Sequence, residues 1–315
     1  MAQTTIVKDR PGTATRSSRR SSQRASEELW AYLFISPWLF GFLFFTAGAM
    51  IFSLGMSFFD TDLLMTTRFI GIRNYTKLID DPLFHKSLQV TFVYTILAVP
   101  VSTIIAMIIA VLLNQKIAWL SFFRTVYYLP AIVTGVPLAL LFSWVLSADY
   151  GLINDALRFI GMKDPPRWLQ SEFWVIPSLV IMALWGAGTN MLLYLAGLQG
   201  IPTSLQEAAR IDGASAMRVF FSVTLPLLTP TIFFNFVMNM IGAFQVFTQN
   251  YVLTQGGPNN ASLSIVLFLY NKGFVQFHFG YASAVAWVLF AIILLFTLLV
   301  FRTSGWVHYE GGLRK

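Results

Sequence analysis

The sequence predicts an all-α integral membrane protein with six transmembrane helices. Of its 315 residues, 56% are hydrophobic and only 11% are charged, whereas a water-soluble domain carries about 25% charged residues. The charges are also unevenly spread, and six stretches of at least 24 residues contain none. Because about 20 helical residues cross a bilayer, each of these stretches is long enough to cross once.

The spans are expected within these charge-free stretches, at residues 31–59, 88–113, 129–147, 173–199, 228–250 and 279–301. The longest stretch, between Arg218 and Lys272, holds 53 residues. Its second half contains the turn-forming run Gly256–Asn260. The apolar segment after this run, residues 261–270, is too short to cross and is interpreted as interfacial or re-entrant.

The span count divides the chain into four parts. Residues 1–28 form a basic tail that is expected to be disordered, because it has few apolar residues to bury. Residues 29–86 hold the first helix and an external loop, residues 87–302 form a core of five transmembrane helices, and residues 303–315 are a C-terminal tail. The core includes a long cytoplasmic loop at about 200–228.

Both termini are predicted to be cytoplasmic. An even number of spans places the termini on one side, and this orientation leaves 13 Lys and Arg inside against eight outside, as the positive-inside rule requires. The tail decides the count. Its role is interpreted as setting the topology, and the alternative role is contact with anionic lipid headgroups. The concentration of basic residues in a tail does not suggest a nucleic-acid partner.

Composition excludes several kinds of site. The chain has no Cys, so disulfides, Cys-ligated zinc and iron–sulfur clusters are ruled out. Its histidines, His85, His278 and His308, lie outside the spans without metal-ligand spacing, and we expect no catalytic residue, no metal site and no cofactor on this chain. A membrane enzyme would instead show a convergent cluster of ionisable residues.

The chain also shows no internal source of energy. None of the predicted spans contains Asp, Glu, Lys or Arg, and ion-driven pumps generally carry such groups within the membrane, although backbone carbonyls alone can hold sodium. No Gly-Lys-Ser/Thr phosphate-binding loop is present. Any energy for work would therefore come from another polypeptide.

The cytoplasmic loop predicts a short helix-turn-helix. Ser204 and Glu207 have the spacing of a capping box, which predicts a helix start there. Gly213 tolerates backbone angles that other residues resist, and a second helix is expected from about Ser215. Such a compact element outside the bilayer is suited to docking into a groove on a partner.

This loop resembles the EAA loop of ATP-binding-cassette importer permeases, whose pattern is Glu-Ala-Ala, three residues, Gly, nine residues, Ile, one residue and Leu-Pro. Here the pattern is met by Glu207–Ala209, Gly213 and Leu225–Pro226, with Val223 in place of Ile. Further motifs resemble the carbohydrate branch of that family, closest to its MalF-like subunits, over residues 31–302. They are Gly71–Tyr75, Asp81–Phe84, Tyr128–Pro130, Gly256–Pro258 and Gly280–Ala284.

The resemblance implies a type I importer permease fold in a bacterial or archaeal cytoplasmic membrane. It implies four kinds of partner: a second, MalG-like permease subunit, two ATPase subunits that bind ATP and Mg²⁺, an extracytoplasmic solute-binding protein, and a carbohydrate. The loop would be a coupling helix that transmits force from the ATPase and performs no bond chemistry. The residues implied in this role are Glu207, Ala208, Ala209, Asp212 and Gly213.

A sugar pathway should offer amides and hydroxyls instead of ions, because sugars are neutral and rich in hydrogen-bonding groups. The fifth predicted span places a polar set within about 100° of a helical wheel, namely Asn235, Asn239, Gly242, Gln249 and Asn250. The fourth adds Gly186, Thr189 and Asn190. The alternative role of the amides is to cross-link helices, and that of the glycines is to permit close packing.

Two further questions stay open from sequence alone. The external loops at about 60–87, 148–172 and 251–278 are either docking surfaces for a solute-binding protein or solvated connectors. The chain itself is either an ATP-driven permease or a secondary transporter or channel for a neutral polar solute. The second class predicts transport by this chain alone.

Overall fold

The computed structural model describes residues 15–61, 67–115 and 118–307, and it divides into two compact units, Met1–Gly55 and Met56–Lys315. The first unit contains α1 (Thr15–Gly41), the π-helical η1 (Phe42–Ala47) and most of α2 (Gly48–Met56). Helix α1 thus extends back into the segment 1–28 that was predicted to be disordered; residues 1–14 of that segment lie outside the described residues.

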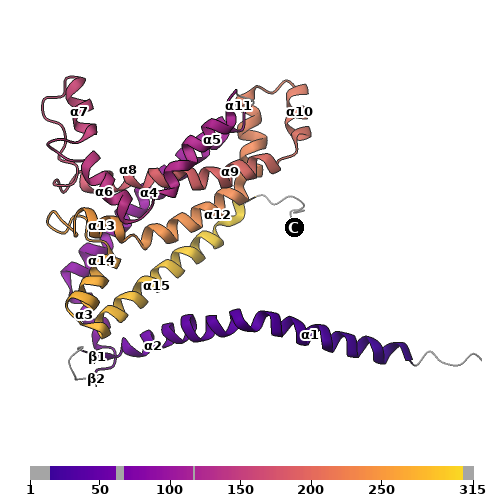
Figure 1. Cartoon of the computed structure of the whole chain (residues 1–315), viewed down its shortest axis with the longest axis horizontal. Coiled ribbons are helices and arrows are strands. Elements are labelled where there is room, and N and C mark those ends of the chain that lie inside the picture. Colours follow the sequence, from indigo (N-terminus) through magenta and orange to yellow (C-terminus); the bar gives the residue numbers. More distant parts are fainter. Residues whose placement is uncertain (1–14, 62–66, 116–117, 308–315) are drawn as a thin grey trace, which may run out of the picture. The chain divides into compact units, whose positions relative to one another are not determined.

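The second unit is helical apart from one small hairpin (Figure 1). Its elements in chain order are β1 (Phe59–Thr61), β2 (Thr67–Phe69), α3 (Arg73–Asp80), α4 (Pro82–Leu113), α5 (Leu120–Tyr128), η2 (Leu129–Ile132), α6 (Val136–Val145), α7 (Leu152–Phe159), α8 (Val175–Ala183), η3 (Leu184–Gly186), α9 (Ala187–Gly200), α10 (Thr203–Ile211), α11 (Ala216–Val219), η4 (Phe220–Thr224), α12 (Leu225–Phe244), α13 (Thr248–Leu253), α14 (Ile265–Tyr270), η5 (Asn271–Val275), α15 (Phe279–Arg302) and η6 (Ser304–Trp306). Strands β1 and β2 pair antiparallel.

Five described helical segments are long and apolar enough to cross a membrane, and a bent pair of helices makes a sixth. The five are Glu27–Met56, Pro82–Leu113, Val175–Gly200, Ala216–Leu253 and Phe279–Trp306. The six-span prediction is confirmed when the bent pair is taken as one span. The apolar helix Ile265–Val275 is shorter than a span, as the sequence predicted for this region.

The third span differs from its prediction as one segment over 129–147. It begins at Leu120, and its two parts, Leu120–Ile132 and Val136–Val145, meet at a bend of 103°. Pro130 lies in the first part, and Gly135 adopts a left-handed φ of 71° at the junction. Proline and a left-handed glycine both interrupt a regular helix, which explains the break.

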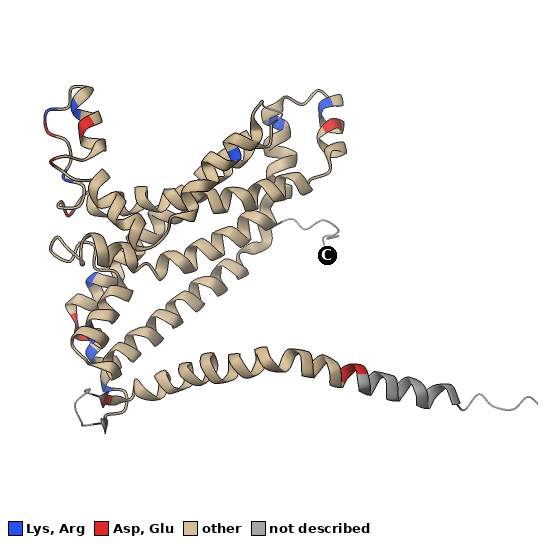
Figure 2. Ribbon diagram, in the orientation of Figure 1, with Lys and Arg blue, Asp and Glu red and all other residues tan. Residues whose placement is uncertain are grey.

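Charged side chains within the spans lie close to the helix ends (Figure 2). Lys86, Arg124 and Arg302 are each within five residues of an end of their span. A Lys or Arg at the bilayer centre costs about 2.5–3.5 kcal/mol on insertion scales, and this cost falls near the interface. The distribution therefore fits helices that cross a bilayer with neutral middles.

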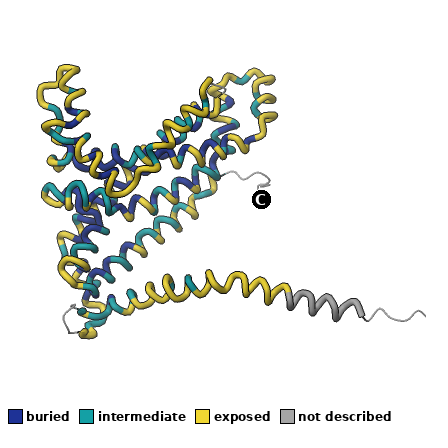
Figure 3. The backbone as a smooth tube through the Cα atoms, in the orientation of Figure 1, coloured by how far each residue is buried: buried dark blue, intermediate teal, exposed yellow. Residues whose placement is uncertain are grey.

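Helix α4 is the centre of the second unit and packs against α8, α9, α12 and α14. Small and hydroxyl-bearing residues line its buried face (Figure 3), including Ser87, Thr91, Ala98, Ser102, Ala106 and Ala110. Small side chains let membrane helices approach closely. The Thr91 hydroxyl also accepts a hydrogen bond from the Ile265 backbone N–H at 2.9 Å, which ties the start of α14 to α4.

Gly188 lies where α9 closely approaches the backbone of another helix. A Cβ atom at Gly188 would collide with the backbone carbonyl oxygen of Tyr127, at the contact of α9 with α5 and η2. We expect Gly188→Ala to destabilise the protein by about 1–3 kcal/mol, because overpacking shifts the backbone. The purified protein should show this as a lower midpoint of thermal unfolding.

Gly200→Ala is the matched control, since Gly200 ends the same helix and a Cβ there meets nothing within 4 Å. An equal midpoint for the two variants would show that the close approach is absent.

Candidate functional site

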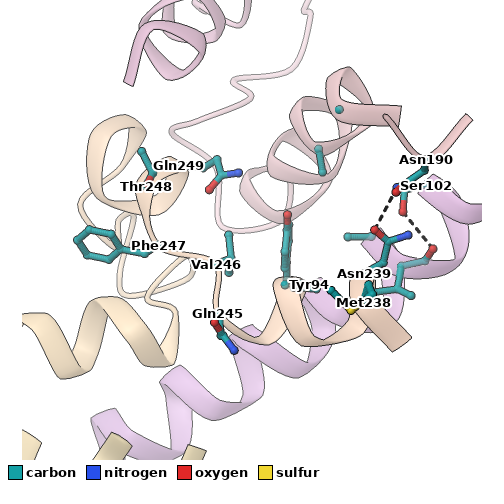
Figure 4. A pocket seen from close by; sticks show the side chains of 16 residues that line it. Tyr94, Ser102, Asn190, Met238, Asn239, Gln245, Val246, Phe247, Thr248 and Gln249 are labelled. Atoms are coloured by element: carbon teal, nitrogen blue, oxygen red, sulfur yellow. Dashed lines mark hydrogen bonds between the residues drawn. The ribbon is translucent and has the colours of Figure 1, made fainter. Parts of the chain in front are cut away.

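A polar cavity of about 430 Å³ lies between three spans of the second unit. Helix α4, the junction of α8 with α9, and the break between α12 and α13 supply its walls (Figure 4). The polar side chains that line it are Tyr94, Ser102, Asn190, Asn239, Gln245, Thr248 and Gln249. Its volume is in the range of small-molecule sites, about 300–1,000 Å³.

The cavity forms where two spans lose regular helical geometry. Helix α12 ends at Phe244 and α13 starts at Thr248, so the intervening residues turn Gln245 and Thr248 toward the cavity. Across it, the 3₁₀ turn η3 separates α8 from α9 at Gly186. Irregular backbone is tolerated at membrane depth only where protein buries it or where it lines a polar cavity. Both irregular points lie at this cavity.

Two asparagines join opposite walls of the cavity. Asn190 Nδ2 on α9 donates a hydrogen bond to Asn239 Oδ1 on α12 at 3.0 Å (Figure 4). Asn239 Nδ2 is buried and has no hydrogen-bond partner among the described residues. A buried donor without an acceptor costs about 1–3 kcal/mol. A ligand oxygen in the cavity would remove this cost.

The lining carries no formal charge, because the described residues around the cavity include no Asp, Glu, Lys, Arg or His. Amides and hydroxyls both donate and accept hydrogen bonds, so the walls match a neutral ligand rich in such groups. Tyr94 and Phe247 add aromatic rings, and Met238 adds an apolar contact. The arrangement is suited to binding a polar solute.

The structure separates the predicted pathway residues into two sets. Those that line the cavity are Gly186, Asn190, Asn239, Gly242 and Gln249. Thr189 lies outside it. Asn235 Nδ2 donates to the Thr231 carbonyl of its own helix at 2.9 Å. Asn250 Nδ2 donates to the Ser262 carbonyl at 2.6 Å and so holds the loop after α13.

The predicted arc on one continuous helix was wrong, because α12 stops at Phe244, before Gln249 and Asn250. Asn235 is buried within its own helix, and Asn250 is buried against the loop. Neither of these amides cross-links two spans, whereas the Asn190–Asn239 hydrogen bond joins α9 to α12 as the cross-linking alternative predicts.

Sequence reasoning missed the wall that α4 contributes. Tyr94, Ala98 and Ser102 line the cavity at a spacing of four residues. Residues four apart lie on one helix face, so this repeat of small and polar residues in the second span was a usable signal. Gln245 and Thr248 were harder to find, since their orientation depends on the helix break.

The loop at about 200–228 contains the two predicted short helices, α10 and α11, joined at Gly213 with a φ of 82°. The predicted capping box at Ser204 was wrong. Helix α10 begins at Thr203, so its N-cap is Pro202, two residues before Ser204, and this start has no side-chain cap. A cap is formed instead at the second helix, where the Ser215 hydroxyl accepts from the Arg218 N–H.

The loop is exposed at the opposite end of the spans from α3, α13 and α14 (Figure 1). Glu207, Ala208, Asp212 and Gly213 are exposed, and Ala209 is half-buried. Three apolar side chains beside them are also exposed: Leu205 at 45%, Ile211 at 86% and Met217 at 68%. A cluster of apolar side chains on a polar, water-facing loop indicates a partner surface.

Residues 91–308 match the model of a protein family described as "Binding-protein-dependent transport system inner membrane component". The chain belongs to this family. The permease is 40% identical to the "Probable ABC transporter permease protein YesP" of Bacillus subtilis (strain 168), covering 95% of this chain and 98% of that protein. It is 33% identical to the "Lactose transport system permease protein LacF" of Rhizobium radiobacter, covering 90% and 97%.

A solved structure shares the permease fold. A chain of a bacterial alginate ABC transporter, crystallised with a periplasmic protein that binds an alginate pentasaccharide, matches 90% of this chain and 96% of its own length. The TM-score is 0.79 at 23% identity. The likeness supports the all-α multi-pass architecture of a type I ABC transporter permease.

The absence of Cys from the sequence allows a direct test of the cavity. Gly242 lines the cavity with open space at its Cβ position, whereas Asn235, two turns earlier on α12, is buried. We expect Gly242→Cys to react with a small water-soluble thiol reagent in membranes at least about tenfold faster than Asn235→Cys, because the polar cavity holds water. Mass spectrometry of this chain measures both rates.

The chain without an introduced Cys is the background for that measurement. A faster reaction at residue 235 than at residue 242 would place the aqueous cavity elsewhere.

Proposed function

We propose that this chain is the transmembrane permease subunit of an ATP-driven, binding-protein-dependent importer for a sugar or oligosaccharide. The observation that carries the proposal is the uncharged cavity walled by the amides of α9 and α12 and the hydroxyls of α4. Sugars present many hydroxyls that donate and accept hydrogen bonds, and they carry apolar ring faces. The unpartnered Asn239 Nδ2 would donate to a sugar hydroxyl, and the ring of Tyr94 would contact an apolar ring face.

Relatives with named substrates support the sugar class. One is the lactose permease LacF, and another is the "Arabinooligosaccharides transport system permease protein AraP" of Bacillus subtilis, 33% identical over 91% of this chain. Lactose and arabino-oligosaccharides are neutral. The neutral lining of this cavity suits ligands of the same kind.

The energy would come from two ATPase subunits on the cytoplasmic side, which bind ATP and Mg²⁺. The spans have neutral middles and the sequence has no phosphate-binding loop, so the energy for transport would not come from this chain. The coupling surface would be the exposed loop around Glu207, Ile211 and Gly213. A MalG-like second permease and an extracytoplasmic solute-binding protein would complete the importer.

The connection of the loop to the cavity suggests how force is transmitted. Helix α9 ends at Gly200, three residues before α10 begins, and α11 continues through η4 into α12. A displacement of the loop therefore acts on both helices that carry the Asn190–Asn239 hydrogen bond. Moving α9 relative to α12 would open the cavity alternately to the two sides of the membrane.

The cytoplasmic membrane of a bacterium or archaeon is the proposed location, with both termini inside. In that orientation α10 and α11 face the cytoplasm, where an ATPase would meet them. A secondary transporter or channel for a neutral solute is the rival function. The family match disfavours it, because the family is named for binding-protein-dependent transport.

Gly213→Pro tests the coupling role. Proline fixes φ near −65°, whereas Gly213 has a φ of 82° and donates its N–H to the Arg210 carbonyl. We expect the variant to insert and assemble but to lose at least about 90% of ATP-dependent uptake, since the loop geometry that transmits force is lost. Proteoliposomes of the complete importer allow uptake of labelled neutral oligosaccharides and ATP hydrolysis to be measured together.

Gly71→Pro is the control, because Gly71 also has a positive φ and open space at Cβ but lies in the external turn before α3. Wild-type uptake by Gly213→Pro would refute the coupling role. If the unmodified importer takes up no neutral oligosaccharide, the sugar assignment is refuted, whatever the result for the coupling role.

A further inference from the structure

The short external helix α7 exposes an apolar stripe. Leu152, Phe159 and Ile160 have exposed fractions of 53%, 92% and 75%, and Ala156 between them is also exposed. These positions are spaced four, seven and eight residues from Leu152, which places them on one helix face. Ile153 and Leu157 on the inward side already pack against a buried apolar cluster, so the exposed stripe is a second apolar face of the same helix.

The opposite face of α7 is held by a buried asparagine. Asn154 Nδ2 donates to the carbonyls of Ala148 and Pro166 at 3.0 and 3.1 Å. Its Oδ1 accepts from the Trp168 indole N–H at 2.7 Å. Three hydrogen bonds from one side chain fix the rotation of the helix, because turning the stripe inward would break them all.

Arg158 fixes the C-terminal turn of the helix. Its guanidinium donates to the carbonyls of Ala148 and Asp149 at 2.9 and 3.0 Å and to the Asp155 carboxylate at 3.0 Å. The exposed Phe159 follows directly. The stripe is therefore held outward by the fold.

These contacts hold α7 beside the external ends of two spans. Ala148 and Asp149 directly follow the end of the third span, since α6 ends at Val145. Trp168 accepts through its carbonyl from the Ser178 hydroxyl within α8 at 3.0 Å, and its ring packs on Trp174 with centroids 5.2 Å apart. The segment after α7 is thus tied to the first turn of α8, and α7 lies beside the ends of both spans.

We propose that α7 is an interfacial helix that inserts Leu152, Phe159 and Ile160 into the outer leaflet of the membrane. The stripe continues an apolar surface already suited to lipid, because Leu140, Leu141 and Trp144 of α6 are 40–57% exposed. Amphipathic helices at membrane surfaces bury their apolar face about 5–10 Å into the headgroup–acyl boundary.

Lipid fits this surface better than the solute-binding protein does. A protein that docks and leaves in each transport cycle would return the stripe to water, including the almost fully exposed Phe159. Interfaces of that kind are about as polar as ordinary protein surface. A bilayer covers the stripe at all times. Insertion would hold the external ends of α6 and α8 fixed while other helices move.

An environment-sensitive fluorophore on a single introduced Cys tests this proposal in the complete complex, purified through a tag on this chain and reconstituted in liposomes. Ile160→Cys lies on the stripe, and Lys163→Cys lies at an exposed, charged position in the loop that follows the helix. The labelled complex without an introduced Cys supplies the background. We expect a blue-shifted emission at residue 160 that phospholipids with brominated tails quench at least about twofold more than the emission at residue 163.

Three results would overturn the proposal. One is a water-like emission at residue 160 that brominated lipid does not quench. Another is a blue-shifted emission that brominated lipid does not quench, which would indicate cover by a protein subunit. The third is a blue shift that appears only after purified solute-binding protein is added. Leu152→Cys repeats the test at the other end of the stripe if the first variant assembles poorly.

Discussion

The high cost of placing charge and unpaired polar groups in a bilayer is the constraint on which the rest of this structure depends. It limits Lys86, Arg124 and Arg302 to the ends of their spans. It also favours a partner or a cavity for polar groups in the middle of a span. The Thr91 hydroxyl meets the Ile265 N–H, and Asn190 meets Asn239 across the cavity.

The same constraint connects the fold to the proposed function. Helix breaks at η3 and after Phe244 lie at one polar cavity, where the irregular backbone is compatible with a membrane. The two helices beside this cavity, α9 and α12, lead directly to the exposed loop that contains α10 and α11. A chain with neutral spans can thus bind a neutral solute at its centre while receiving force at one end.

Much of the fold was predictable because its signals are local. Charge-free stretches predicted the spans. Gly213 predicted the turn of the loop, and the second helix was expected from about Ser215. The bend of the third span also had local signals in Pro130 and Gly135. The site was less predictable. Nothing in the sequence around Phe244 stops a helix, so the end of α12 depends on packing, and the contribution of Tyr94 and Ser102 depends on how α4 meets α12.

The central claim is tested most directly by measuring transport with and without the ATPase subunits. Liposomes are prepared with this chain and its permease partner, with and without the ATPase subunits. They are supplied with ATP, the solute-binding protein and a labelled oligosaccharide that the solute-binding protein binds. The account predicts accumulation above the external concentration only when the ATPase is present. Sustained uphill accumulation without a nucleotide-hydrolysing subunit would contradict it.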